Sequence, residues 1–251
     1  MRDKIINWLF NYCEESKNKG FVVGVSGGVD SALVSTLCAL TGLPVIVVGM
    51  PIHQESSQIS RSEKHMQWLC DNYKNVQKVT VELTETFEAF KKSCHNLSEL
   101  ALVNTRSRLR MVTLYSIANT NNMLVAGTGN KVEDYGIGFF TKYGDGGVDI
   151  SPIADLLKSE VRQMAKELGI LEDIVNAIPT DGLWGDSRSD EDQIGASYDE
   201  LEWALQYYDK HGENYENLSE RQKEVLTIYI KRHISNKHKL EVPPVCYLEN
   251  I

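Results

Sequence analysis

Short apolar runs alternate with longer amphipathic segments along the first half of the chain. Ile5, Leu9 and Cys13 recur at helical spacing, which predicts an opening helix that ends by Gly20. Four short apolar or alternating segments predict strands, at residues 21–25, 44–49, 76–83 and 123–126. Helical spacing occupies the intervals, at residues 31–40, 59–73, 86–94 and 97–119. Strands and helices that alternate in this way predict an α/β fold with a parallel sheet.

The second half of the chain is less regular. A glycine-rich region covers residues 127–147, and helical spacing returns at 159–168, 198–210 and 220–233. Residues 178–192 are polar and lack an apolar period, so we expect them to form a functional loop that closes over substrate. The tail from Ser235 is expected to be irregular. With no repeat and no clear linker, a single domain over residues 1–251 is predicted.

Composition excludes several classes of protein. The net charge is −9 and no long run of lysine or arginine occurs, which argues against binding of nucleic acid through phosphate neutralisation. The five cysteines form no Cys-x-x-Cys pair, so a zinc site or disulfide framework is not expected and a reducing cytoplasm fits. The longest apolar run, residues 43–52, is shorter than the about 20 residues that span a bilayer. We therefore expect a cytoplasmic protein that contacts neither nucleic acid nor membrane.

The segment Ser26-Gly27-Gly28-Val29-Asp30-Ser31 lies between the first predicted strand and a helix. Its two glycines let the backbone approach a ligand closely, and amide groups at a helix N-terminus favour an anion. Asp30 is suited to a magnesium ion that bridges phosphate oxygens. The segment lacks the lysine of a Walker A loop and the spacing of a Gly-x-Gly-x-x-Gly fingerprint. It predicts a phosphate-binding turn, with an ordinary glycine-pair turn as the alternative.

Two further segments carry candidate chemistry. Gly127-Thr128-Gly129-Asn130 follows the fourth predicted strand, and the loops after parallel strands meet at one edge of a sheet. Thr128 could therefore bond a nucleotide, and Glu133 could share a magnesium ion with Asp30. The glycine-rich loop 139–149 combines aromatic, cationic and acidic residues, which suits a heteroaromatic ring with anionic groups. A plain turn with core aromatic residues is the alternative for that loop.

One predicted helix carries polar residues on a face where a core helix would be apolar. Asn104, Arg108, Met111 and Tyr115 are spaced four, three and four residues apart, so they share one face. This face predicts either a polar ligand pocket or a subunit contact. A solvated arginine in a surface network explains the same spacing equally well.

Taken together, these segments resemble the bacterial type of ammonia-dependent NAD synthetase, a family of ATP pyrophosphatases. The resemblance runs from the opening helix to His238-Lys239, and residues 61–66 and 184–188 depart from the usual pattern. The resemblance implies a Rossmann-like three-layer fold of the adenine nucleotide α-hydrolase type, with a doubly wound parallel sheet and helices on both faces. The segments that carry it are residues 26–31, 104–111, 127–133 and 138–147, with Pro179-Thr180 and Gly182-Leu183-Trp184.

The resemblance also implies a reaction. A ligase of this family amidates deamido-NAD⁺ with ammonia through an adenylated carboxylate, yielding NAD⁺, AMP and pyrophosphate in the last step of NAD biosynthesis. Members use ATP as co-substrate and Mg²⁺ as cofactor, and they are homodimers with the dinucleotide site at the subunit interface. The length leaves no room for a glutaminase domain, so free ammonia is the expected donor.

Two other functions are compatible with the first loop. Another ATP pyrophosphatase, GMP-forming or tRNA-modifying, shares that loop, although a tRNA modifier should show basic patches and often paired cysteines. A nucleotide sensor without activity would be expected to lose Asp30, Glu133 or Lys158, and all three are present.

The resemblance assigns roles to individual residues. Mg²⁺ would be bound by Asp30 and Glu133, and Lys158 and Asp149 are the expected catalytic residues, Asp149 orienting ammonia. Deamido-NAD⁺ would be bound by Arg108, Lys142, Asp149, His238 and Lys239. ATP would be bound by Gly24, Val25, Ser26, Gly27, Gly28, Val29, Asp30, Ser31, Thr128, Lys158 and Thr180.

Overall fold

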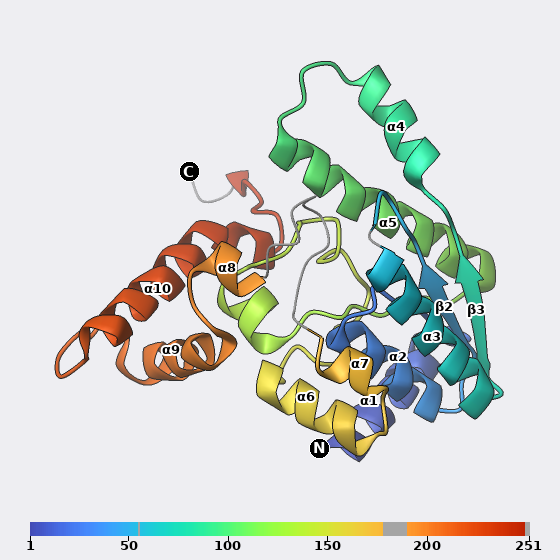
Figure 1. Cartoon of the computed structure of the whole chain (residues 1–251), viewed down its shortest axis with the longest axis horizontal. Helices are drawn as coiled ribbons and strands as arrows, with labels where there is room; N and C mark the ends of the chain where they lie inside the picture. The colour runs from blue at the N-terminus through green and yellow to red at the C-terminus, as the bar shows by residue number, and fades with distance from the viewer. Residues whose placement is uncertain (55, 178–189, 249–251) are drawn as a thin grey trace.

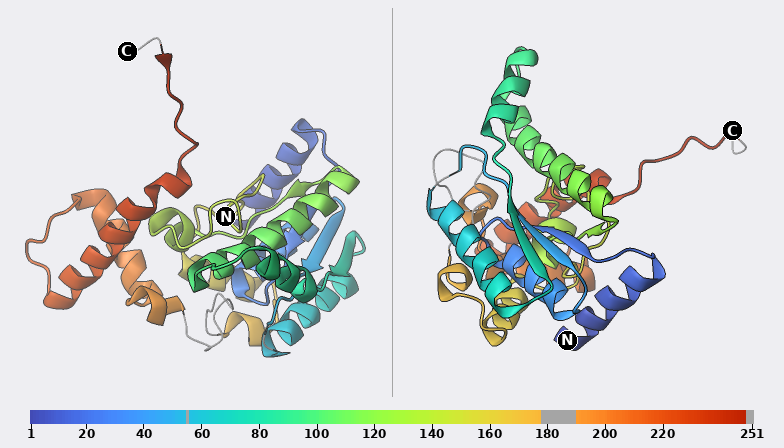
Figure 2. Two further views of the ribbon diagram at one scale, coloured as in Figure 1. Left: turned by 90° about the horizontal axis from the view of Figure 1, so that it is seen from above. Right: turned by 90° about the vertical axis from the view of Figure 1, so that its right-hand side faces the viewer.

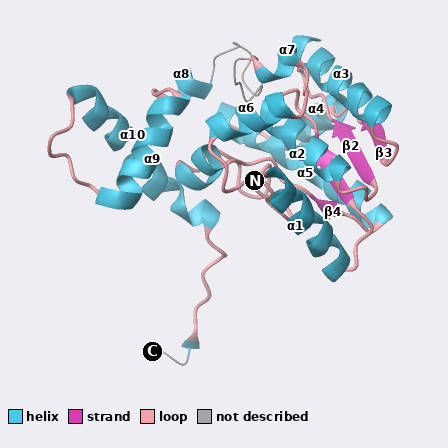
Figure 3. Cartoon of the chain, turned by 90° about the horizontal axis from the view of Figure 1, so that it is seen from below, coloured by secondary structure: helices cyan, strands magenta, loops and turns pink. Residues whose placement is uncertain are grey.

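A parallel four-stranded sheet, magenta in Figure 3, lies between two layers of helices. The computed structural model describes residues 1–54, 56–177 and 190–248. Within these residues the strands follow the order β3-β2-β1-β4 across the sheet, so the chain first builds outward from β1 and then returns to its other side. The strands are β1 (Phe21–Gly24), β2 (Val45–Gly49), β3 (Val76–Thr80) and β4 (Leu124–Val125).

Both faces of the central strands are buried, which explains why their sequences are continuously apolar. Phe21 and Val23 of β1 point into one core, whereas Val22 points into the other. β2 repeats this alternation, with Val47 on the first side and Val48 on the second. The side-chain period of two therefore divides each strand between two helical layers.

Helices cover both faces of the sheet (Figure 1). The larger core contains side chains of α1 (Arg2–Glu15), α2 (Val29–Leu40), α3 (Ser56–Asn72), α6 (Lys158–Glu167) and α7 (Glu172–Val175). The opposite core is covered by α4 (Thr84–Ser93) and α5 (Glu99–Asn121). This arrangement confirms the predicted α/β architecture with helices on both faces of a parallel sheet. Among the described helices, none combines the length and apolar character needed to cross a membrane.

A third core joins the glycine-rich region to the C-terminal helices. Its elements are the π-helical turn η1 (Lys131–Gly136), α8 (Asp190–Ile194), α9 (Tyr198–His211) and α10 (Glu220–Leu240). Ser197 and Ser219 cap α9 and α10 through capping boxes. These helices lie to one side of the sheet in Figure 1. The helical turn η1 is not predicted by the sequence pattern, because its glycine-rich surroundings conceal it.

The prediction of an irregular tail from Ser235 is wrong, because α10 continues to Leu240. Polar side chains in its last turns contact the glycine-rich region of residues 127–147. Asn236 Nδ2 donates to Ile137 O at 2.9 Å, and Lys239 Nζ donates to Gly138 O at 2.9 Å. These contacts are long-range and leave no periodic signal in the sequence. Beyond the helix, residues 241–248 extend away from the body of the molecule (Figure 2).

The order of the strands creates a divergence at one edge of the sheet. The chain leaves β1 toward β2, whereas it leaves β4, the other neighbour of β1, toward the C-terminal half. Loops that diverge from adjacent parallel strands leave a crevice at their carboxyl ends. Beyond β4, Ala126 forms a parallel bridge with Ile150, which returns the glycine-rich loop to this edge.

His65 is a fully buried side chain between α3 and α2. Its Nε2 lies 3.0 Å from Ser35 Oγ, and its ring stacks on Trp68 with centroids 5.6 Å apart. Nδ1 is buried without a hydrogen-bond partner in the described structure. Burial lowers the pKa of His65 to about 4, because the charged imidazolium cannot be solvated there.

This burial predicts acid destabilisation. The unfolded chain takes up a proton on His65 below about pH 6.5, whereas the folded chain does not until about pH 4. The free energy of unfolding should therefore fall as the pH drops through this window, by roughly 2–3 kcal/mol at the lower end. Urea unfolding across the window measures it, with His65→Gln as the comparison. An equally steep loss in the variant would contradict the assignment to His65.

Candidate active site

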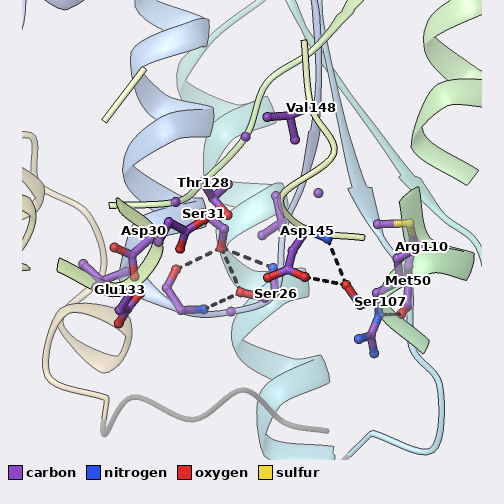
Figure 4. Close-up of a pocket in the computed structure, with 18 of the residues that line it drawn as sticks. Ser26, Asp30, Ser31, Met50, Ser107, Arg110, Thr128, Glu133, Asp145 and Val148 are labelled. Atoms are coloured by element: carbon purple, nitrogen blue, oxygen red, sulfur yellow. Dashed lines mark hydrogen bonds between the residues drawn. The ribbon is translucent and has the colours of Figure 1, made fainter. Parts of the chain in front are cut away.

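A cavity of about 290 Å³ lies at the carboxyl ends of β1, β2 and β4. The divergent loops after β1 and β4 form its floor, and side chains from α3, α5 and α6 line its walls. Figure 4 shows Asp30 and Glu133 gathered at one end and Arg110 at the other. The cavity therefore occupies the crevice that the strand order creates.

The turn after β1 is held by its own serine side chains. Ser26 N donates to Ser31 Oγ at 3.2 Å, and Ser31 Oγ donates to Gly28 O at 3.0 Å. Gly28 N donates to Ser26 Oγ at 3.2 Å. No side chain caps the N-terminus of α2 at Gly28, so the first amide groups of the helix remain available to a ligand. This geometry suits an anion at the positive end of the helix dipole.

Gly27 is required at its position for two reasons. Its φ of 90° lies in the left-handed region, which L side chains rarely adopt. A Cβ there would also lie 2.9 Å from Gln58 O in the first turns of α3. Ser62, one turn later, donates from Oγ to Val25 O at 2.7 Å. α3 is thereby fastened against the turn and fixes its shape.

Lys158, Asp30 and Glu133 form a buried ion cluster beside the turn. The Lys158 side chain is 3% exposed, and its Nζ contacts both Asp30 Oδ2 and Glu133 Oε1, the latter at 2.9 Å. Burial alone lowers the pKa of Lys158, but the two carboxylates outweigh it and raise the pKa above its ordinary value. The ring of Tyr198 lies 4.9 Å from the ammonium group and covers it. The cluster therefore holds one cation between two anions.

Asn130 completes this cluster. Its Nδ2 donates to Asp30 Oδ1 at 3.0 Å and to Glu133 Oε2 at 2.7 Å. Its Oδ1 accepts from the backbone amides of Val132 and Glu133, which caps η1. All four hydrogen-bonding positions of this buried amide are thus used, and they set the separation of the two carboxylates.

A second acidic region lies between the glycine-rich loop and α5. Ser107 Oγ donates to Asp145 Oδ1 at 2.6 Å, and the Thr141 amide donates to the same oxygen at 3.0 Å. Burial raises the pKa of Asp145. Burial also raises the pKa of Asp134 well above its ordinary value, with Asp145 and Glu133 adding repulsion. A Cβ at Gly129 would overlap the Asp134 carboxyl group, so this glycine makes room for it.

The structure gathers most of the ATP-binding residues expected from the sequence around this cavity. Thr180 lies outside the described residues. The remaining members of that set line the cavity, as does Glu133: Gly24, Val25, Ser26, Gly27, Gly28, Val29, Asp30, Ser31, Thr128 and Lys158.

The residues expected to bind deamido-NAD⁺ are not among those that line the cavity. Four of them meet where α5, the glycine-rich loop and α10 converge. Arg108 Nε donates to Lys142 O at 3.3 Å, and Lys142 Nζ donates to the carbonyl oxygen of His238. Lys239 Nζ donates to Gly138 O and Phe140 O, both at 2.9 Å. Arg108 therefore connects α5 to the loop, and the two lysines connect the loop region to α10.

Asp149 lies at the base of the same loop. Its Oδ1 accepts from Tyr115 OH at 2.9 Å, and its Oδ2 accepts from Val125 N at 2.8 Å. Burial, together with the Asp149 carboxylate, raises the pKa of Tyr115. Both oxygens of Asp149 thus anchor the returning loop to β4 and α5.

Sequence reasoning assigned no role to several residues that the fold brings to the cavity. Asn130 was foreseeable, since an asparagine followed three residues later by glutamate is a helix-start pattern. The others carry no local signal, because distant elements bring them in: Arg61, Ser107, Arg110 and Asp134.

The donor set at Asp30 and Glu133 suits Mg²⁺ when phosphate is present. No group of three or more potential metal-ligating side chains occurs within the described ranges. Mg²⁺ commonly uses one or two carboxylates together with substrate phosphates and water, so two carboxylates beside an anion-binding turn fit it. In this structure Lys158 supplies the positive charge between them.

Removing the lysine charge should destabilise the folded protein. We expect Lys158→Met to lower the free energy of unfolding by about 3 kcal/mol, because two largely buried carboxylates lose their partner. Mg²⁺ should raise the unfolding temperature of this variant more than that of the wild type. Lys166→Met, on the exposed side of the same helix, is the matched control. An unfolding temperature within about 1 °C of the wild type would refute the prediction.

Comparison with known proteins places this fold and site in a family. Residues 1–243 match the family model described as NAD synthase. The chain is 42% identical over 206 residues to the "NH(3)-dependent NAD(+) synthetase" of Mesoplasma florum, covering 80% of this chain and 81% of the relative. It is 36% identical to the protein of that name from Methanococcoides burtonii, over 100% of this chain and 95% of the relative.

A solved structure has the same fold. The structure titled "Structure of NMN synthetase from Francisella tularensis" superposes with a TM-score of 0.85 at 30% identity, covering 98% of this chain and 96% of the other. The fold is of the adenine nucleotide α-hydrolase type, as expected, and the match extends through all three cores. The chain belongs to the NAD synthase family of ligases that form a C–N bond.

Proposed function

We propose that this chain uses ATP and ammonia to convert deamido-NAD⁺ to NAD⁺, with AMP and pyrophosphate as the other products. The observation that carries the proposal is the ion cluster of Asp30, Glu133 and Lys158 beside an uncapped helix N-terminus. A site with these groups binds a polyphosphate and compensates its charge. Relatives named for NH(3)-dependent synthesis, matched over most of their length, support ammonia as the nitrogen donor. The family match and the names of these relatives do not favour a GMP-forming or tRNA-modifying activity.

In the first step the nicotinate carboxylate attacks the α-phosphorus of ATP. An O–P bond forms, the bond from that phosphorus to the bridging β-oxygen breaks, and pyrophosphate leaves with the electron pair. The turn of residues 24–31 would hold the outer phosphates through its amide groups. Lys158 would turn from its two carboxylates to the phosphates, with Thr128 in contact with the nucleotide. Positioning and charge compensation therefore account for this step.

Mg²⁺ bound by Asp30 and Glu133 would neutralise phosphate oxygens and favour departure of pyrophosphate. Asn130 holds both carboxylates toward the cavity through its two amide hydrogens. The two carboxylates are thus prepared for a cation before substrate arrives, with Lys158 in its place.

In the second step ammonia attacks the carbonyl carbon of the adenylate. A C–N bond forms, the C–O bond to AMP breaks with its electron pair on AMP, and the nitrogen loses a proton to solvent water. We propose that Asp149 orients ammonia from the base of the loop, where Tyr115 and Val125 hold it. We also propose that Thr180 contacts ATP.

Deamido-NAD⁺ would bind beside the cavity, where α5, the glycine-rich loop and α10 converge. Arg108, Lys142 and Lys239 would provide positive charge for its two phosphates there, with His238 beside them. To bind it, the lysines must exchange their backbone carbonyl partners for phosphate oxygens. We further propose that the chain acts as one domain in the cytoplasm.

We propose that the protein is a homodimer through the outer face of α5. Arg108 and Val112 are four residues apart and share this face, and Leu100 lies about two turns before Arg108 on the same helix. Leu100 is 59% exposed and Val112 is 64% exposed, although both are apolar. A second copy packed there would cover them and bring Arg108 to the subunit boundary.

A second candidate substrate is favoured by one comparison. The structure of the Francisella tularensis protein, titled NMN synthetase, superposes on this chain with a TM-score of 0.85. The corresponding reaction would amidate nicotinate mononucleotide by the same adenylation chemistry. The two substrates differ in an adenylate half that only the dinucleotide carries.

One assay tests both the proposed reaction and the choice of substrate. Protein, ATP, Mg²⁺ and ammonium are mixed with deamido-NAD⁺ or with nicotinate mononucleotide, and amide product and AMP are followed. We expect equal amounts of NAD⁺ and AMP, with deamido-NAD⁺ the better substrate because the dinucleotide contacts more of the basic region. ADP in place of AMP would contradict the adenylation step.

Asp30→Asn is the control for that assay. The variant should lose AMP formation, because it removes one of the two carboxylates, while its unfolding temperature shows whether the fold persists. Turnover at the wild-type rate in Asp30→Asn would contradict the proposed metal role. Faster amidation of nicotinate mononucleotide would replace the proposed substrate with the second candidate.

The dimer proposal predicts the effect of a charge on α5. Val112→Asp should shift the mass measured by light scattering from two chains to one, because a buried carboxylate without a partner disfavours the contact. Affinity for deamido-NAD⁺ should fall with it, whereas affinity for ATP should not. Lys91→Asp, a charge change on α4, is the control. A dimer that persists in Val112→Asp would place the subunit contact elsewhere.

A further inference from the structure

Arg61 is a cation that lines the cavity and takes no part in the reaction steps proposed above. In the described part of the cavity lining, three side chains are cationic: Arg61, Arg110 and Lys158. Lys158 is paired with Asp30 and Glu133. Arg110 Nε donates to Met50 O at 3.0 Å. Arg61 Nε, by contrast, is buried and has no hydrogen-bond partner within the part of the chain that the structure describes.

The backbone around Arg61 is fixed against the phosphate-binding turn. Gly27 lies beneath this turn of α3, and a Cβ on Gly27 would be 3.3 Å from the Cβ of Arg61. The next residue, Ser62, bonds Val25 O. The Cβ of Arg61 therefore lies beside Gly27, the first glycine of the turn. Lys158 contacts Asp30 near the other end of the turn.

A buried donor without a partner costs free energy in the ligand-free protein. Such a cost is recovered when a ligand supplies the acceptor, and a guanidinium group suits phosphate because its donors match two oxygens at once. Carboxyl groups of Asp30, Glu133, Asp134 and Asp145 also line the cavity. A polyphosphate that enters this acidic surrounding needs a cation with a donor that no acceptor among the described residues already uses, and Arg61 Nε is such a donor.

We propose that Arg61 binds the outer phosphates of ATP and holds the pyrophosphate that leaves in the first step. The inference rests on the proposed function and adds Arg61, from α3, to the side chains that bind phosphate at that site. As the bond between the α-phosphorus and the bridging oxygen breaks, the electron pair moves to pyrophosphate, and Arg61 stabilises the added charge. Arg61 also opens residues 61–66, the stretch in which the sequence departs from the usual family pattern.

Calorimetric titration with inorganic pyrophosphate and Mg²⁺ tests the proposal without requiring turnover. We expect Arg61→Gln to weaken pyrophosphate binding about 10- to 100-fold, the range for loss of charged hydrogen bonds. Arg61→Lys should bind with intermediate affinity, because it keeps the charge and loses the planar donors. AMP, which lacks the outer phosphates, should bind all variants equally. Lys64→Gln, on the same helix with a side chain 57% exposed, is the matched control and should bind pyrophosphate as the wild type does.

The possible results separate this inference from the proposed reaction. Pyrophosphate affinity within twofold of the wild type in Arg61→Gln would overturn the assignment. So would an equal loss in Lys64→Gln, or an equal loss of AMP affinity. Circular dichroism and thermal unfolding of each variant show that the fold is retained. If the wild type makes no NAD⁺ yet binds pyrophosphate through Arg61, the reaction is refuted and the site for outer phosphates stands.

Discussion

The pairing of one buried lysine with two carboxylates is the constraint on which the site depends. Lys158 comes from α6, Asp30 from α2 and Glu133 from η1, so three distant segments must meet for the charges to be compensated. An unpaired charge at this depth would be strongly unfavourable. The three charges therefore stabilise the fold around the cavity when these segments meet, and the structure holds them together beside the turn.

Around this cluster, the sheet positions the loops that form the cavity, and the helices hold those loops in place. The divergence of the loops after β1 and β4 opens the crevice, and α3 closes it from the side by fastening Val25 and Gly27. Among the described residues, no side chain caps the first turn of α2. In the proposed function, this helix terminus, the glycine turn and the ion cluster face the same phosphate groups, and each is held by a different contact.

The basic residues near α10 have a different character. Lys142 and Lys239 donate to backbone carbonyl oxygens, and they join the glycine-rich loop to the last turns of the helix. Carbonyl oxygens are weaker partners for an ammonium group than phosphate oxygens. In the proposed function, the same lysines therefore order this region and then turn to the phosphates of a dinucleotide when it arrives. In the proposed function, this region recognises the substrate and the cavity carries the phosphate chemistry.

The sequence by itself determined the sheet, the helices on its two faces and the phosphate-binding turn, because these depend on local periodicity and on glycine at particular positions. Asp30, Glu133 and Lys158 were also foreseeable as a group, through the family resemblance. Only the tertiary structure decided that Lys158 lies between the two carboxylates, that Asn130 spaces them and that α10 runs on to Leu240. Only it brought Arg61 to the turn. These features arise from contacts between residues far apart in the chain, and burial and charge compensation leave no period along the sequence from which to infer them.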